Sequence, residues 1–232
     1  MTLDMTEGRL GPRPDAIIFD MDGTLFRTET NIVAAYERAY ARLAAEGLAQ
    51  GEMPAPTVLL GSLGMLLTDI WMRVLPDASE AARERMDVLL LEAQLALLAE
   101  GVGELYPEVR ETLERLRSAG CRLFVASNGL ERYVKGVAEH TGIAGLFEGL
   151  YSAGEYRTAS KVDLVRLLLD RHGVASAWMV GDRSSDVEAG VRNGLPVVGC
   201  DYAAFGVATD KELQGATVLI RRFGELAALA GA

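Results

Sequence analysis

The 232-residue chain has little cysteine, no excess of basic charge and no long hydrophobic run. Its two cysteines, Cys121 and Cys200, adjoin apolar runs and lack metal-site spacing, which predicts core thiols. The longest apolar stretch, residues 58–67, is too short to span a membrane and contains a serine and two glycines. The first residues include Asp4 and Glu7 and no apolar segment, so we expect no signal peptide and a cytoplasmic location.

The charge balance is acidic, with a formal net charge of -10. This excludes the basic surface typical of nucleic-acid binding, and we expect neither nucleic acid nor a membrane as a partner. An acidic surface also repels small anions at long range. An anionic substrate would therefore need a site that a metal ion or a few cations make locally positive.

Two acidic residues follow the first apolar run. Residues 16–19 predict a buried strand, and Asp20 and Asp22 come directly after it. Side chains at this spacing in an extended segment point to the same side, and two close anions need a cation or a proton between them. The pair therefore indicates a cation site, a nucleophile with an acid, or both, with an ordinary turn as the alternative. The spacing excludes a calcium loop, because Leu25 and Asn31 stand where glycine and glutamate are required.

The remaining chain separates into a helical part and an alternating part. Apolar residues at helical spacing predict a helix beginning near residue 28 and further helices at about 63–75 and 79–99. Apolar runs at 122–126, 147–151, 177–180, 195–200 and 218–220 predict strands, separated by helices at about 107–119, 130–141, 160–172 and 185–193. Ser185 and Glu188 match a capping box at the start of the last of these helices.

Strands that are apolar throughout and alternate with helices indicate a parallel sheet covered on both faces. We therefore predict an α/β protein with a doubly wound parallel sheet. Residues 15–27 and 103–232 would form this core, residues 28–102 an inserted helical cap, and residues 1–14 a loose tail.

Three more polar clusters lie at or near predicted strand ends, where ligands bind in open α/β sheets. Ser127 and Asn128 suit either a phosphate oxygen or a helix N-cap. Asp182 follows the run ending at residue 180, and a third carboxylate there fits magnesium. Asp186 is either a dipole-compensating acid or a carboxylate supporting that cation. Lys161 is either solvated or the cation that the phosphate requires.

Together these clusters resemble the haloacid dehalogenase superfamily, and specifically its helical-cap phosphatases, the phosphoglycolate phosphatase-like and beta-phosphoglucomutase-like members. The resemblance covers nearly the whole chain after the tail. Residues 61–64, Gly-Ser-Leu-Gly, also resemble a cap stretch of phosphoglycolate phosphatase-like members. The motifs stand in the order Asp20-x-Asp22-Gly23-Thr24, Ser127-Asn128, Lys161, and Gly181-Asp182 with Asp186.

The resemblance implies a role for each motif residue. Asp20 would be the nucleophile that forms an aspartyl-phosphate, and Asp22 would protonate the leaving oxygen and later accept a proton from water. Mg2+ would be bound by the side chains of Asp20 and Asp182 and the main-chain carbonyl of Asp22, with Asp186 supporting the site. The phosphoryl group would be held by Ser127, Asn128 and Lys161.

The chain departs from the family pattern at two positions. Arg27 stands where many members have an acid, and Val162 stands where many have proline after the motif lysine. We hypothesise that Arg27 contacts an anionic part of the substrate, with a solvated hinge arginine as the alternative. The expected function is a magnesium-dependent phosphatase acting on a small soluble phosphate monoester. A sugar-phosphate mutase and a non-catalytic regulatory protein are the alternatives.

Overall fold

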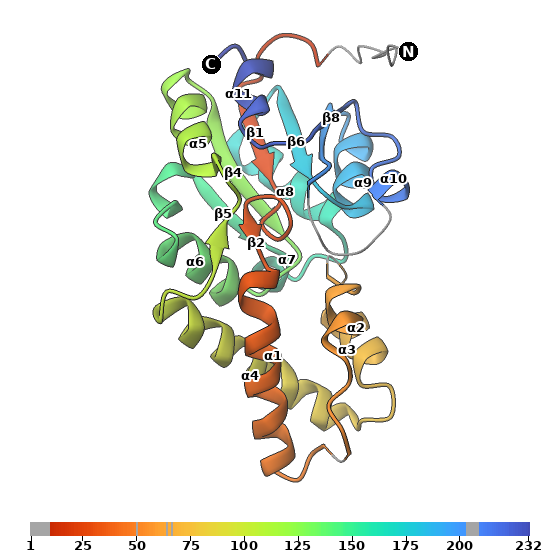
Figure 1. Cartoon of the computed structure of the whole chain (residues 1–232). Helices are drawn as coiled ribbons and strands as arrows, with labels where there is room; N and C mark the ends of the chain where they lie inside the picture. The colour runs from red at the N-terminus through yellow and green to blue at the C-terminus, as the bar shows by residue number, and fades with distance from the viewer. Residues whose placement is uncertain (1–9, 50, 64, 66, 203–208) are drawn as a thin grey trace, which may run out of the picture.

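The computed structural model describes residues 10–49, 51–63, 65, 67–202 and 209–232, without the side chains at positions 67, 68, 209 and 210. Most of the predicted tail, residues 1–9, and Gly64 of the cap stretch lie outside the described residues. An α/β core forms one end of the molecule and carries the C-terminus, and a helical cap forms the other (Figure 1).

The core is built on one sheet of six parallel strands. Their spatial order is β5 (Gly149–Ser152), β4 (Arg122–Ser127), β1 (Ala16–Phe19), β6 (Ala177–Gly181), β7 (Val197–Cys200) and β8 (Val218–Ile220). After β1, the next two strands of the sheet, β4 and β5, lie on one side of it. The last three, β6, β7 and β8, lie on the other side. This order confirms the predicted doubly wound sheet and places the reversal at β1, where ligand sites form.

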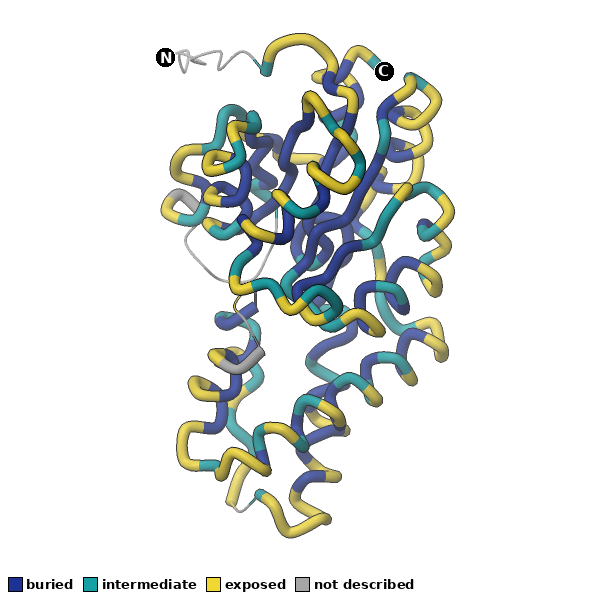
Figure 2. Tube along the Cα trace, turned by 180° about the vertical axis from the view of Figure 1, so that it is seen from behind, coloured by how far each residue is buried: buried dark blue, intermediate teal, exposed yellow. Residues whose placement is uncertain are grey.

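Alternate side chains of each strand supply two separate cores. In β1, Ile17 and Phe19 pack under α5 (Val109–Ser118), α6 (Glu131–His140) and α11 (Glu225–Leu229). Ala16 and Ile18 point to the other face, which α8 (Lys161–His172) and α9 (Ser184–Arg192) cover. The inner strands β1, β6 and β7 are consequently buried throughout, whereas the edge strands β5 and β8 are buried only in part (Figure 2).

The cap is inserted between two short strands, β2 (Phe26–Arg27) and β3 (Glu104–Leu105), which pair antiparallel. It contains α1 (Glu29–Ala45), α2 (Pro56–Leu60), α3 (Leu67–Val74) and α4 (Glu80–Ala99). Helix α1 packs along α4 and the cap has an apolar core of its own. Helix α4 also packs against α6, which connects the cap to the core.

Several local predictions were wrong. Helices α2 and α7 (Ala153–Tyr156) and the β2–β3 ribbon were not predicted, and α3 begins at Leu67 instead of near residue 63. The two cysteines are buried and free, as predicted. Within the described part of the chain, no helix is long and apolar enough to cross a membrane.

Candidate active site

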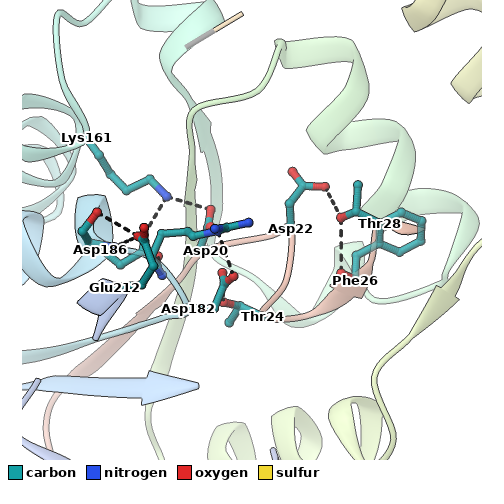
Figure 3. A network of polar contacts seen from close by, with 11 residues as sticks. Asp20, Asp22, Thr24, Phe26, Thr28, Lys161, Asp182, Asp186 and Glu212 are labelled. Atoms are coloured by element: carbon teal, nitrogen blue, oxygen red, sulfur yellow. Dashed lines mark hydrogen bonds and ion pairs between the residues drawn. The ribbon is translucent and has the colours of Figure 1, made fainter. Parts of the chain in front are cut away.

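Three neighbouring strands bring the predicted site residues to one edge of the sheet. Asp20 follows β1, Ser127 ends β4 and Asp182 follows β6, and β1 lies between the other two. Lys161 is the first residue of α8, and Asp186 lies in the first turn of α9. Figure 3 shows Lys161 between Asp20 and Asp186, with Asp182 close by.

Lys161 connects two acidic residues in the interior. Its Nζ lies 2.8 Å from Oδ1 of Asp20 and 2.6 Å from Oδ1 of Asp186, and its side chain is only 2% exposed. The solvated alternative for this lysine is therefore wrong. Burial opposes the ammonium form, but the carboxylates of Asp186 and Asp20 outweigh it and raise the pKa of Lys161.

Asp186 uses both of its oxygens inside the protein. Oδ1 contacts Lys161, and Oδ2 accepts a hydrogen bond of 3.0 Å from the main-chain N–H of Arg183, which caps α9. The predicted capping box of Ser185 and Glu188 is therefore wrong by two positions, because the N-cap residue is Arg183 and Asp186 closes the box. A Cβ on Gly181 would lie 2.2 Å from the Asp186 carboxyl carbon, which explains why glycine precedes Asp182.

Asp22 faces away from this cluster. Its Oδ1 accepts hydrogen bonds from Thr28 Oγ1 at 2.6 Å and from Tyr133 OH at 2.5 Å (Figure 3 shows the Thr28 contact). The two carboxylates have different partners but line the same cavity, although the chain between them is not extended as predicted. The N–H groups of Leu25 and Phe26 both donate to the Met21 carbonyl, and Gly23 has φ 80°, so the backbone turns.

A cavity between core and cap joins both groups. Its core side includes Asp20, Asp22, Ser127, Asn128 and Lys161, which are the predicted nucleophile, acid and phosphate-binding residues. It encloses about 750 Å3 of space, part of which is open to solvent. The Ser127 hydroxyl also accepts a hydrogen bond of 3.1 Å from the Gly129 N–H, which orients it at the end of β4.

Arg27 does not line this cavity. Its guanidinium lies 2.7 Å from Glu104 Oε2 and 3.3 Å from Glu29 Oε1, across the β2–β3 ribbon. With these contacts Arg27 connects the two chain segments that join cap and core. The structure thus places it at the hinge, as in the alternative interpretation, and separate from the other site residues.

The carboxylates form an arrangement that fits a divalent cation. Carboxylate oxygens of Asp20, Asp182 and Asp186 all lie within 4.8 Å of one another, and all three residues are buried. Burial is the main cause that raises the pKa of each, the neighbouring carboxylates raise it further, and Lys161 lowers it only in part. Oxygen donors with excess negative charge are what Mg2+ prefers. Asp186 contacts Lys161 and the Arg183 N–H, and Asp182 contacts Thr24 at 3.3 Å and the Arg183 guanidinium at 3.4 Å, so all three carboxylates would have to share their oxygens between the protein and a cation.

Comparison with known proteins agrees with this geometry. The family model for haloacid dehalogenase-like hydrolases matches residues 14–194. The chain belongs to this family. It is 29% identical over 202 residues to the phosphoglycolate phosphatase of Pseudomonas putida, covering 83% of this chain and 71% of the relative. It is 27% identical over 201 residues to the 5'-nucleotidase of Pseudomonas aeruginosa, covering 85% and 86%.

A solved structure supports the same assignment of the fold. The predicted phosphoglycolate phosphatase from Haemophilus somnus superposes with a TM-score of 0.78 at 20% identity, over 93% of this chain and 97% of the other. The resemblance found in the sequence motifs is thus confirmed. This haloacid dehalogenase-like hydrolase is a phosphatase of the phosphoglycolate phosphatase-like subgroup.

Sequence reasoning missed several residues of the hydrolase's cavity, and three of them carry polar groups that bear on its chemistry. Thr28 and Tyr133 donate to Asp22, and Asp87 of α4 lines the cap side. Tyr133 lies beside apolar residues of α6, so its position in the sequence predicts a core residue and not a site residue. The position of Thr28 shortly after the first motif does not by itself indicate a contact with Asp22. Asp87 interrupts the apolar residues of α4 and could have been noticed for that reason.

Proposed function

We propose that this hydrolase is a magnesium-dependent phosphatase that cleaves a small phosphate monoester through an aspartyl-phosphate on Asp20. The observation that carries the proposal is the buried contact of Lys161 with Asp20, at the floor of a cavity that also contains Asp22. Burial raises the pKa of Asp20, whereas the ammonium group of Lys161 lowers it and fixes the orientation of the carboxylate, as a nucleophile requires.

The first chemical step would use Asp20 and Asp22 in separate roles. An Asp20 carboxylate oxygen attacks phosphorus, and the bond from phosphorus to the alcohol oxygen breaks. Asp22, protonated at this stage, gives its proton to the departing oxygen. The raised pKa of Asp22, caused mainly by its burial, favours the protonated form that this step needs.

The second step releases phosphate from Asp20. The Asp22 carboxylate takes a proton from water, the water oxygen attacks phosphorus, and the acyl-phosphate bond breaks to regenerate the Asp20 carboxylate. Ser127, Asn128 and Lys161 would contact the phosphoryl oxygens during both displacements. The cation would be held by Asp20, Asp182 and the Asp22 carbonyl, and when bound it would offset the negative charge on nucleophile and phosphate.

A panel of esters tests this proposal. Phosphate release would be measured with phosphoglycolate, sugar phosphates, nucleoside monophosphates and an aryl phosphate, each with Mg2+ and with a chelator. We expect release that depends on Mg2+. Failure to release phosphate from any ester, by folded protein in Mg2+, would favour the mutase or the non-catalytic alternative, which a sugar-phosphate interconversion assay then separates.

Replacing Asp182 tests the cation site without an activity assay. In the unaltered protein Mg2+ should raise the free energy of unfolding by about 2.7 kcal/mol at a hundredfold excess over its Kd. In Asp182→Asn we expect this increase to be lost, and the stability of the metal-free variant reports the separate loss of the buried contact with Arg183. Thermal unfolding with and without Mg2+ measures both. The exposed Asp170→Asn is the control, and an equal Mg2+ effect in Asp182→Asn would contradict the assignment.

The hydrogen bond from Tyr133 to Asp22 should appear in the pH profile. The kcat/KM value should decline as pH rises through the pKa of Asp22, because the carboxyl group must be protonated when the alcohol leaves. Burial raises this pKa, and hydrogen bonds from Thr28 and Tyr133 lower it. Tyr133→Phe removes one of them, so the decline should move to higher pH.

Tyr40→Phe provides the control for this measurement. Tyr40 donates to the Glu52 carbonyl within the cap and does not line the cavity. Its profile should match that of the unaltered protein. A profile of Tyr133→Phe that stays in place or moves to lower pH would show that Tyr133 does not control the proton on Asp22.

A further inference from the structure

The cavity between core and cap has two walls of different chemistry. The core wall contains the carboxylates and Lys161 described above. On the other side, apolar side chains dominate, and they come from α1, α2, the segment before α3, α3, α4 and the residue before α6. These are Ile32, Leu59, Leu63, Ile70, Leu90 and Leu130.

One charged side chain interrupts the apolar wall. Asp87 of α4 lines the cavity and is half-buried, and its Oδ1 accepts a hydrogen bond from Nε1 of the buried Trp71. This contact anchors the carboxylate on the cap side. Burial raises the pKa of Asp87, the Trp71 contact lowers it, and the nearby Glu84 raises it.

Positive charge is confined to the core wall. Among the described residues that line the cavity, Lys161 is the only cation, and it contacts Asp20 and Asp186. The undescribed side chains between residues 64 and 68 belong to a glycine, two leucines and a threonine. Two arginines of the cap, Arg73 and Arg83, donate to the main-chain carbonyls of Gly61 and Leu75.

We infer that the substrate is a phosphate monoester whose leaving group is apolar and carries no second anionic group. This inference rests on the proposed phosphatase function and adds the class of alcohol that the cap accepts. The phosphoryl group would lie against the core wall, and the alcohol portion would contact the apolar side chains of the cap.

The physical reason is the combination of apolar surface and one unmatched carboxylate. Transfer of an alkyl or aryl group from water to this wall is favourable, and each methylene group adds to the affinity. A carboxylate or second phosphate on the alcohol would lose its hydration there and would meet Asp87, and among the described residues no arginine or lysine of the cap lines the cavity. Phosphoglycolate, the ester in the names of the relatives, is such a doubly anionic compound.

A matched set of esters tests the inference. Values of kcat/KM would be measured with Mg2+ for ethyl, benzyl and para-carboxybenzyl phosphate and for phosphoglycolate, at slightly alkaline pH where the carboxyl groups are ionised. Benzyl phosphate should exceed ethyl phosphate by at least about tenfold. It should exceed para-carboxybenzyl phosphate, which has a closely similar leaving alcohol, by at least about tenfold as well.

Asp87→Asn then tests the charge discrimination. Asparagine keeps an oxygen that can accept from Trp71 and removes only the charge. The preference for benzyl over para-carboxybenzyl phosphate should decrease by at least about threefold. Glu80→Gln, a change at an exposed residue of the same helix that does not line the cavity, removes the same charge and should leave this preference unchanged.

The outcomes distinguish the inference from the function on which it rests. Hydrolysis that favours phosphoglycolate or para-carboxybenzyl phosphate overturns the inference and leaves the phosphatase intact. An unchanged preference in Asp87→Asn overturns the role of Asp87 and with it the charge argument. If folded protein hydrolyses none of the esters, the proposed function itself fails and the inference falls with it.

Discussion

Asp20→Asn should lower the rate of phosphate release by at least about 10000-fold, because the amide cannot form the phosphoenzyme. Of the acidic motif residues, Asp20 is the one that both contacts Lys161 and lines the cavity. It follows directly after β1. The fold should persist, since Lys161 keeps its contact with Asp186. Phosphate release with the best ester, measured beside circular dichroism, checks both expectations.

Asp15→Asn is the matched control for that variant. Asp15 is exposed and precedes β1, at the opposite end of the strand from Asp20. The same change of acid to amide there should leave the rate unchanged within about twofold. Substantial phosphate release by Asp20→Asn would show that another group or a water molecule attacks phosphorus directly.

Lys161→Met should reduce the stability of the metal-free protein by about 3–5 kcal/mol and abolish phosphate release. Lys161 is buried, and its removal leaves the carboxylates of Asp20 and Asp186 close together without the ammonium group between them. Methionine has nearly the same length, so the change removes the charge and little packing. The free energy of unfolding in urea provides the measurement.

Lys135→Met shows what an ordinary ion-pair lysine contributes. Lys135 contacts Glu131 and Glu155 on the surface, and its side chain is 39% exposed. Solvent screens these pairs, so this variant should lose less than about 1 kcal/mol. Equal losses in the two variants would mean that Lys161 is not the counter-ion of the buried carboxylates.

The strands of the core could be predicted because burial on both faces demands continuous apolar runs. Residues 16–19 and 177–180 illustrate this, and their ends located Asp20 and Asp182 correctly at one sheet edge. Helix α2 has only five residues and begins at Pro56, so it offers too few turns for periodicity to detect. The β2–β3 ribbon joins residues almost 80 positions apart, and a local pattern carries no sign of such pairing.

The candidate site shows the same division between local and distant information. The acidic motif residues could be predicted because close carboxylates at the ends of buried strands are unfavourable without a cation or a proton between them. The direction of the Asp22 side chain depends on the turn at Gly23 and on Tyr133, which is 111 residues away. Arg27 was linked to substrate from its place in the chain, but Glu29 and Glu104 engage it at the hinge. The apolar cap wall with Asp87 could be recognised only after the cap helices were placed over the core.

The most direct test of the account is to trap the phosphoenzyme. In Asp22→Asn, Asp20 can still attack the phosphorus of an ester with a good leaving group, such as an aryl phosphate, but the variant lacks the base that activates water. Acid quenching followed by peptide mass spectrometry should find one phosphoryl group on the peptide that contains Asp20. This phosphoryl group should be absent in Asp20→Asn. A phosphoryl group on another residue, such as Ser127, or phosphate release with none on the protein, would contradict the mechanism.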